Sequence, residues 1–217
     1  MNRLVKRVFD ISLSLVGLLV LFPLFVAIAI AIKLDSPGPV FFRQERVGWE
    51  ARRFRIYKFR SMRVTDPGDH ANYSPTNDAR ITRVGSLLRA SFVDELPQLI
   101  NVLRGDMSLV GPRPETPEFV ALYSEVERRV LMMKPGMTGP SAIAFWNEGD
   151  ILAAHDDPDA FYKGWVLPER IRMDMTYQDR ASLLFDLSML FRTASVIVTR
   201  GRLLGQDASS TSTTSPA

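Results

Sequence analysis

The sequence predicts an α+β fold, a mainly helical domain with a short β-hairpin behind an N-terminal membrane anchor. Residues 11–32 contain no charged side chain. Two runs rich in β-branched and aromatic residues, Val40 to Phe42 and Phe54 to Phe59, are separated by a charged connection that contains Gly48. Most later apolar residues recur at helical spacing. A chain of 217 residues has room for one domain of ordinary size and an appendage.

The composition limits the partners and the kinds of active site that are compatible with this chain. The net charge is +3 and the pI is near 9.4, and the Lys and Arg residues are clustered. This clustering indicates anionic partners such as phosphates, lipid headgroups or nucleic acid, unless it is only a solvated basic face. The chain contains no cysteine, which excludes disulfides, thiolate metal sites and cysteine nucleophiles.

The uncharged run predicts a membrane anchor over residues 1–34, because about 20 apolar residues cross a bilayer core. A cleaved signal peptide is the competing interpretation, since Ala27-Ile28-Ala29 resembles a cleavage site. The run is, however, longer than the ~7–15 residues of a signal peptide's apolar region. We therefore expect the segment to remain in the membrane.

Pro23 lies near the middle of the anchor and should break or kink its helix there. The basic residues that flank the run lie on both sides of it, although the positive-inside rule places cations on the cytoplasmic side. They are Arg3, Lys6 and Arg7 before the run and Lys33, Arg43 and Arg46 after it. A re-entrant helix satisfies both flanks, and a kinked spanning helix is the alternative.

Alternation in the second strand places Phe54, Ile56, Lys58 and Arg60 on one face. An inward-pointing cation is unfavourable unless it meets an anion. Lys58 and Arg60 are therefore candidates for binding an anion, unless the strand ends and both side chains reach solvent.

The rest of the catalytic domain, predicted over residues 35–205, is mainly helical. A long loop over residues 65–77 precedes a helix that contains Leu87, and a second helix follows. Because Pro97 is tolerated only in a first turn, this second helix should begin at about Asp94 or Glu95, and Gly105 should cap its end. We further expect a helix over residues 117–133, turns at 134–136 and 138–140, amphipathic helices over 167–200, and a disordered tail over 206–217.

Asp94 and Glu95 are the first candidate catalytic residues. A helix N-terminus favours an ionised carboxylate, and neighbouring helical side chains point about 100° apart. One carboxylate could then attack a substrate while the other holds a divalent metal, unless both merely decorate the helix start. Further along, Pro112 and Pro114 restrain Arg113 for contact with a phosphate or carboxylate, unless this arginine is simply solvated.

Several motifs occur together in one order. They are Ser36-Pro37-Gly38-Pro39-Val40-Phe41-Phe42 with Gln44, Arg46, Val47 and Gly48, then Tyr57-Lys58-Phe59-Arg60-Ser61-Met62, Asp94-Glu95-Leu96-Pro97-Gln98, Pro112-Arg113-Pro114 and Lys134-Pro135-Gly136-Met137-Thr138-Gly139. In this combination the chain resembles the bacterial sugar transferase family, the monotopic phosphoglycosyl transferases. The resemblance extends from the anchor to about Arg200.

The resemblance implies a mainly helical cytosolic domain seated on the bacterial inner membrane by a re-entrant helix. It implies transfer of a sugar-1-phosphate from a UDP-sugar to polyprenyl (undecaprenyl) phosphate, with release of UMP and use of Mg²⁺, as the first membrane step of glycoconjugate synthesis. Asp94 would be the nucleophile and Glu95 the metal ligand. The implied substrate-binding residues are Lys58, Arg60, Arg89, Pro112, Arg113, Pro114 and Asp174. Membrane lipid and a possible second copy of the chain are further implied partners, and nucleic acid is not expected.

The chain departs from the family pattern in two places. Phe22 precedes the anchor proline where the family often has Ser, and Pro140 and Phe145-Trp146-Asn147-Glu148 stand where an aromatic residue and an Arg-Asn pair are common. The sugar is therefore left open, and no role is assigned to His70 or His155. The alternatives are a non-enzymatic membrane module that binds anionic lipid or nucleic acid, and a metal-dependent phosphodiesterase.

Overall fold

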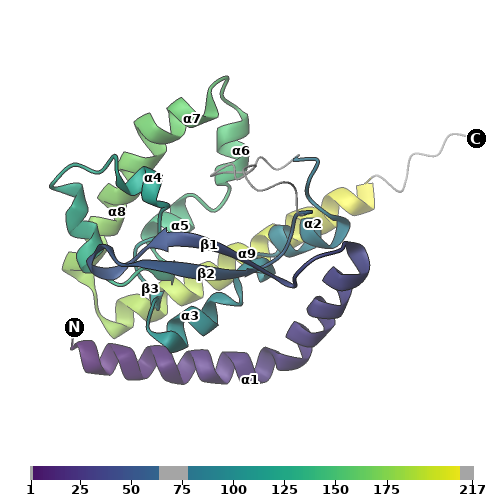
Figure 1. Ribbon diagram of the computed structural model, residues 1–217, viewed down its shortest axis with the longest axis horizontal. Helices are drawn as coiled ribbons and strands as arrows, with labels where there is room; N and C mark the ends of the chain where they lie inside the picture. The colour runs from purple at the N-terminus through teal and green to yellow at the C-terminus, as the bar shows by residue number, and fades with distance from the viewer. Residues whose placement is uncertain (1, 64–77, 211–217) are drawn as a thin grey trace, which may run out of the picture.

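The computed structural model describes residues 2–63 and 78–210, and it is mainly helical with two small sheets (Figure 1). This confirms the α+β prediction. The longer helices are α1 (Arg3–Asp35), α2 (Arg83–Ala90), α3 (Gln98–Arg104), α8 (Leu167–Arg180) and α9 (Leu183–Ser210). The shorter ones are α4 (Pro117–Val120), α5 (Pro140–Ala144), α6 (Glu148–Ala153), α7 (Pro158–Phe161), the 3-10 turns η1 (Trp49–Ala51), η2 (Val93–Glu95) and η3 (Glu127–Met132), and the π-helical turn η4 (Tyr162–Val166).

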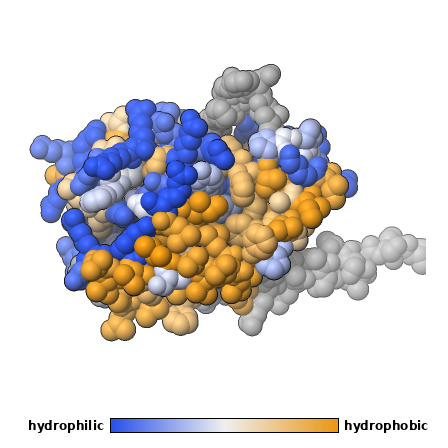
Figure 2. All heavy atoms as spheres, turned by 60° about the horizontal axis from the view of Figure 1, so that its bottom comes forward, coloured by the Kyte–Doolittle hydropathy of each residue, from blue (hydrophilic) through white to orange (hydrophobic). Residues whose placement is uncertain are grey.

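Helix α1 is the candidate membrane anchor. In the part of the chain that the structure describes, it is the helix long and apolar enough to cross a bilayer. Figure 2 shows apolar side chains gathered on the face that carries α1, and Leu19, Val20 and Phe22 are each more than three-fifths exposed there. A break or a kink was predicted at Pro23, and the helix does not break there. The helix is continuous through the proline and bends between its two ends (Figure 1).

Both ends of α1 contact the same domain. Near its start, the Arg7 guanidinium donates hydrogen bonds of 2.5 and 2.8 Å to the last carbonyls of α3, those of Val102 and Leu103. Near its end, the Asp35 carboxylate accepts a 3.0 Å hydrogen bond from the Val84 N–H in the first turn of α2. A straight helix of 33 residues would be about 50 Å long, and the bend of α1 turns its second part toward α2 (Figure 1).

The predicted hairpin is present. Strand β1 (Phe41–Val47) pairs antiparallel with β2 (Arg53–Phe59), and Phe42 lies opposite Lys58. The first strand is longer than the sequence indicated, because its charged second half is paired along its whole length. The side chain of Asn101 in α3 bonds the backbone of β2 at the Tyr57 N–H and the Arg55 carbonyl, which fixes α3 against the hairpin.

Two segments differ from the prediction. Gly136 and Thr138, which were predicted to lie in two separate turns, belong to strand β4 (Gly136–Thr138), which pairs in parallel with β3 (Ser108–Val110). The predicted helix over 117–133 is divided into α4 and η3. Ser124 and Glu127 bond each other's backbone N–H in a capping box, which starts a new helical segment and ends the old one.

The C-terminal helices agree with the prediction in type. Helices α8 and α9 are two separate helices, and α9 extends through residues 206–210, which were predicted to belong to a disordered tail. The remainder of that tail, and the loop predicted over 65–77, lie outside the described residues. Tyr177 of α8 and Met189 of α9 lie in the same buried cluster as Val102 of α3. The last two helices therefore complete the core around α3, the helix that follows Asp94 and Glu95.

Candidate active site in a cavity beside Asp94

Asp94 and Glu95 lie in the 3-10 turn η2, three to four residues ahead of the first residue of α3. The prediction that they occupy the first turn of that helix is therefore wrong in detail, because Leu96 and Pro97 intervene. Phe92, just before η2, has a φ of 56°, an uncommon value for a non-glycine residue. This backbone conformation turns the chain between α2 and η2, so that the Asp94-Glu95 pair, here called the dyad, follows α2 closely.

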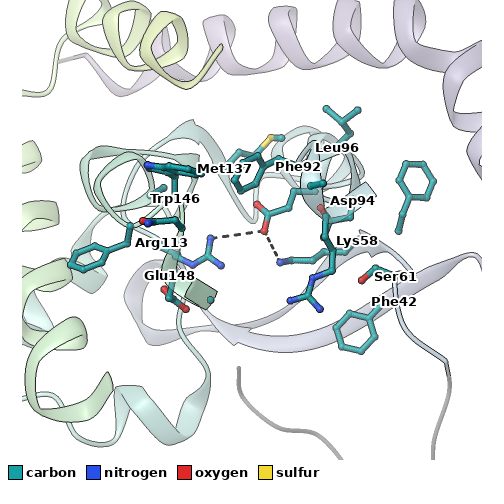
Figure 3. Close-up of a pocket in the computed structure, with 18 of the residues that line it drawn as sticks. Phe42, Lys58, Ser61, Phe92, Asp94, Leu96, Arg113, Met137, Trp146 and Glu148 are labelled. Carbon is teal, nitrogen blue, oxygen red and sulfur yellow. Dashed lines mark hydrogen bonds and ion pairs between the residues drawn. The ribbon is translucent and has the colours of Figure 1, made fainter. Parts of the chain in front are cut away.

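Glu95 is held by two cations. Its Oε1 lies 2.6 Å from the Nζ of Lys58 on β2 and 3.9 Å from a terminal nitrogen of Arg113, as the dashed lines in Figure 3 show. Burial alone would raise the pKa of Glu95, but the charges of Lys58 and Arg113 and the hydrogen bonds it accepts lower it to about 2. Glu95 is therefore a stable anion.

Asp94 is only 9% exposed. Burial raises its pKa to about 6, and the charges of Lys58 and Arg89 oppose that rise. The expectation that a helix terminus would favour the anion does not describe this residue, because desolvation is the larger effect. Asp94 is still mostly ionised at pH 7, and it is poorly hydrated, as suits a carboxylate that attacks an electrophile.

Arg113 comes from the loop after β3, and three backbone contacts hold that loop. The Pro112 carbonyl accepts a 2.8 Å bond from the Gly136 N–H, and the Pro114 carbonyl accepts a 3.3 Å bond from Arg46. The Arg113 N–H donates to Asp174 at 3.2 Å. The two prolines and these bonds therefore fix the position from which the guanidinium reaches Glu95.

A cavity of about 960 Å³, at the upper end of the range for ligand sites, adjoins the two carboxylates. Its polar end carries Asp94, Glu95, Lys58, Arg89 and Arg113. Two carboxylates and three cations from four separate segments meet there, which is a constellation suited to phosphate chemistry.

A sequence profile of the bacterial sugar transferase family matches residues 1–200, which is most of the chain. The chain belongs to this family. The resemblance that the motifs indicated is thereby confirmed.

Individual relatives agree with the family. The chain is 38% identical over 195 residues to the UDP-glucose:undecaprenyl-phosphate glucose-1-phosphate transferase of Escherichia coli K12, covering 88% of this chain and 40% of that protein. It is 42% identical over 212 residues to the exopolysaccharide production protein PSS of Rhizobium leguminosarum, covering 93% and 99%. It is 39% identical over 200 residues to a UDP-N-acetylgalactosamine-undecaprenyl-phosphate N-acetylgalactosaminephosphotransferase of Aeromonas hydrophila, covering 90% and 44%. The chain thus spans about 40% of the length of several relatives and nearly all of one.

Two residues that the sequence assigned to this sugar transferase site have other contacts. Arg60 donates hydrogen bonds to the Pro37 and Ser36 carbonyls just after α1, at 2.8 and 2.7 Å. Asp174 is 3% exposed and accepts bonds from the Ser141 hydroxyl and the Arg113 N–H. Substrate binding by these two residues stays a prediction, and their contacts favour positioning roles, Arg60 for the anchor and Asp174 for Arg113.

The carboxylates fit Mg²⁺ only as a shared site. No group of three or more metal-binding His, Cys, Asp or Glu side chains occurs within residues 2–63 and 78–210. Beside the proposed nucleophile Asp94, Glu95 supplies one carboxylate, and Mg²⁺ commonly takes one or two carboxylates together with substrate phosphates and water. Such a donor set suffices only if the substrate supplies further ligands, and Mg²⁺ binding stays a prediction.

Sequence reasoning missed the buried charges behind Arg113. Glu115 accepts a hydrogen bond from Tyr162 at 3.0 Å and pairs with Arg170 at 3.2 Å, and Arg170 also pairs with Glu148. No spacing rule connects these positions, which come from three segments. His155 stacks on Phe161, and His70 lies outside the described residues.

Proposed function

We propose that this protein transfers a sugar-1-phosphate from a UDP-sugar to polyprenyl phosphate, and that it does so as a cytoplasmic-face enzyme of the bacterial inner membrane. The names of its relatives specify UDP-sugars and undecaprenyl phosphate as their substrates. The observation that carries the proposal is the position of Asp94, a buried carboxylate in the same cavity as Lys58, Arg89 and Arg113. An attacking carboxylate and a diphosphate repel each other, and the cations offset that repulsion.

In the first step, a carboxylate oxygen of Asp94 attacks the β-phosphorus of the UDP-sugar. The bond from that phosphorus to the bridging oxygen breaks, UMP leaves with the bridging oxygen and its electron pair, and the sugar phosphate remains on Asp94 as an acyl phosphate. Lys58 and Arg113 stabilise the charge on the phosphate oxygens. Glu95, held by both cations, would hold Mg²⁺ together with the diphosphate, and the metal would neutralise the charge of the departing UMP.

In the second step, an oxygen of polyprenyl phosphate attacks the same phosphorus. The bond to Asp94 breaks, the carboxylate is restored, and a polyprenyl diphosphate sugar is released. Splitting the transfer into two displacements lets a water-soluble donor and a membrane-bound acceptor use one site in turn. A site close to α1 suits this order, because the acceptor stays in the bilayer. A re-entrant α1 would keep both of its ends, and the site, on one side of that bilayer.

Mass spectrometry of the trapped enzyme tests the mechanism. With UDP-sugar and Mg²⁺ but no lipid acceptor, the peptide that contains Asp94 should gain one sugar phosphate, and UMP should appear in equal amount. Asp94→Asn should abolish both signals, because an amide is a far poorer nucleophile, and Glu95→Gln should chiefly impair metal-dependent turnover. Asp179→Asn, which changes an exposed aspartate on α8, should behave as the wild type. An adduct on another residue, or full activity of Asp94→Asn, would contradict the proposal.

The identity of the sugar needs a separate assay. UMP release measured against a panel of UDP-sugars, including UDP-glucose and UDP-N-acetylgalactosamine, should select one donor. Release without any adduct would instead indicate a phosphodiesterase that uses water.

A further inference from the structure

The cavity beside Asp94 has an apolar wall that the chemistry of phosphates does not explain. The polar end carries the dyad and its cations. The same cavity is also lined by the apolar side chains of Leu96, Met137, Ile143, Leu190, Val196 and Ile197, which form what we call its apolar wall. A UDP-sugar is polar over most of its length and would leave such a wall in contact with water, which is unfavourable by about 25 cal/mol for each Å² of apolar surface.

Helix α9 supplies much of this wall with one face. Leu190, Thr193, Val196 and Ile197 recur at intervals of three or four residues, line the cavity and are only partly buried. The Thr193 hydroxyl is already bonded to the Met189 carbonyl at 2.8 Å and to the Thr138 hydroxyl at 2.6 Å. This face of α9 therefore presents a surface that is apolar in effect and unfilled within the described residues.

The wall and the candidate membrane anchor share one apolar cluster. Met137, Ile143 and Leu190 pack on the same apolar cluster as Leu18 and Leu21 of α1. In Figure 3, Phe92, Leu96 and Met137 lie on the side of Asp94 that faces the ribbons of α1 and α9. On the other side of α9, Phe191 and Val198 are 75% and 55% exposed, so this helix is apolar toward both the cavity and its surroundings.

We propose that the apolar wall binds the first isoprenoid units of the lipid acceptor, with the acceptor phosphate at the cationic end. The inference rests on the proposed function, and it adds where the hydrocarbon chain of the lipid acceptor binds. An apolar chain that ends in a phosphate matches the cavity at both ends, in charge at Lys58 and Arg113 and in hydrophobicity at α9. Because the wall packs on the same cluster as Leu18 and Leu21 of α1, a chain bound there would lie close to the anchor, and burying it against the wall would remove apolar surface from water.

Photocrosslinking tests the binding site without any turnover. The full chain is reconstituted in phospholipid nanodiscs with a polyprenyl phosphate that carries a diazirine in its first isoprenoid unit, and no UDP-sugar is added. The tryptic peptide 193–200 should be labelled, and unlabelled polyprenyl phosphate should compete. Val196→Asn should lower this labelling at least tenfold. Val198→Asn, the same change two residues away on the exposed face, should leave it within twofold of the wild type.

Kinetics separate this inference from the proposed function. Val196→Asn and Ile197→Asn should raise the KM for long-chain polyprenyl phosphate at least tenfold, while the acceptor-free burst of UMP stays within twofold of the wild type. A wild type without that burst would overturn the proposed function, whereas the crosslinking result would still decide where the lipid binds. Labelling confined to α1, or an equal loss in Val196→Asn and Val198→Asn, would overturn the apolar wall as the acceptor site.

Discussion

The ammonium of Lys6 lies 2.5 Å from a carboxylate oxygen of Asp186, although 180 positions separate these residues in the chain. Asp186 is fully buried and also accepts a 2.6 Å hydrogen bond from the Tyr177 hydroxyl. Lys6 lies 3.3 Å from Asp10 as well, so one ammonium is shared by two buried carboxyl groups. The start of the anchor is thereby tied to the start of α9.

Lys6→Met should strongly destabilise the fold. It leaves Asp10 and Asp186 buried without a counter-ion, a change that typically lowers the free energy of unfolding by about 3–5 kcal/mol. Thermal unfolding of the detergent-solubilised protein, followed by circular dichroism, measures the effect. Lys163→Met removes an exposed pair with Asp159 and should change the melting temperature little. Equal small shifts in both variants would mean that the Lys6 pair does not hold the anchor.

The contacts at both ends of α1 predict that both ends face the same side of the membrane. The chain has no cysteine, so single cysteines at Asn2 and Pro39, which are both exposed, give an unambiguous test. A membrane-impermeant thiol reagent should label neither in intact cells and both after permeabilisation. Labelling of either position from outside would show that α1 spans the bilayer.

Lys58→Ala and Arg113→Ala should each reduce kcat/KM for UMP release. If these cations stabilise charge on the transferring phosphate, each loss should correspond to about 2–4 kcal/mol of transition-state stabilisation. Arg53→Ala, which removes an exposed arginine paired with Glu45 on the same hairpin, is the matched control and should retain activity. Near-normal turnover of both variants would show that Lys58 and Arg113 do not stabilise the phosphate and serve only to hold Glu95 in place.

Gly136→Ala should disturb the loop that carries Arg113. A Cβ at this position would lie 2.1 Å from the backbone nitrogen of Gly111, so β3 and β4 could not stay paired as they are. We expect a loss of about 1–3 kcal/mol in the free energy of unfolding, as for other overpacked sites, together with reduced activity. Gly164→Ala, where an added Cβ meets nothing within 4 Å, should be neutral or slightly stabilising. Parallel measurement of melting temperature and UMP release compares the two variants.

Asp174→Asn should alter the pH dependence of stability. Burial raises the pKa of Asp174 from 3.8 to about 6, so between these values the folded state binds a proton that the unfolded state does not. Lowering the pH from 7 to 4 therefore favours the folded wild type through this group, by at most about 3 kcal/mol. The melting temperature of Asp174→Asn relative to wild type should thus fall as the pH is lowered. Asp179→Asn should show a constant difference, and a constant difference in Asp174→Asn would contradict the raised pKa.

Features that depend on neighbouring residues could be predicted from the sequence alone. The uncharged run of α1, the alternation that forms the hairpin, and Gly105, which ends α3 with a φ of 91°, each follow from local rules of hydrophobicity, periodicity or backbone freedom. The ordered motifs around Asp94 and Arg113 were sufficient to indicate the family. They were sufficient because a motif is defined by the types and the order of its residues, and both can be read from the sequence.

Which of these groups lie in contact, and how deeply they are buried, depends on the tertiary structure. Arg60 was predicted to bind phosphate from its strand face, yet the end of α1 lies close enough to occupy its guanidinium. Burial, and not a helix terminus, sets the pKa of Asp94. The parallel pairing of β3 with β4 and the apolar face that α9 turns to the cavity join segments far apart in the chain. Such contacts depend on how side chains pack in three dimensions, which local periodicity does not encode.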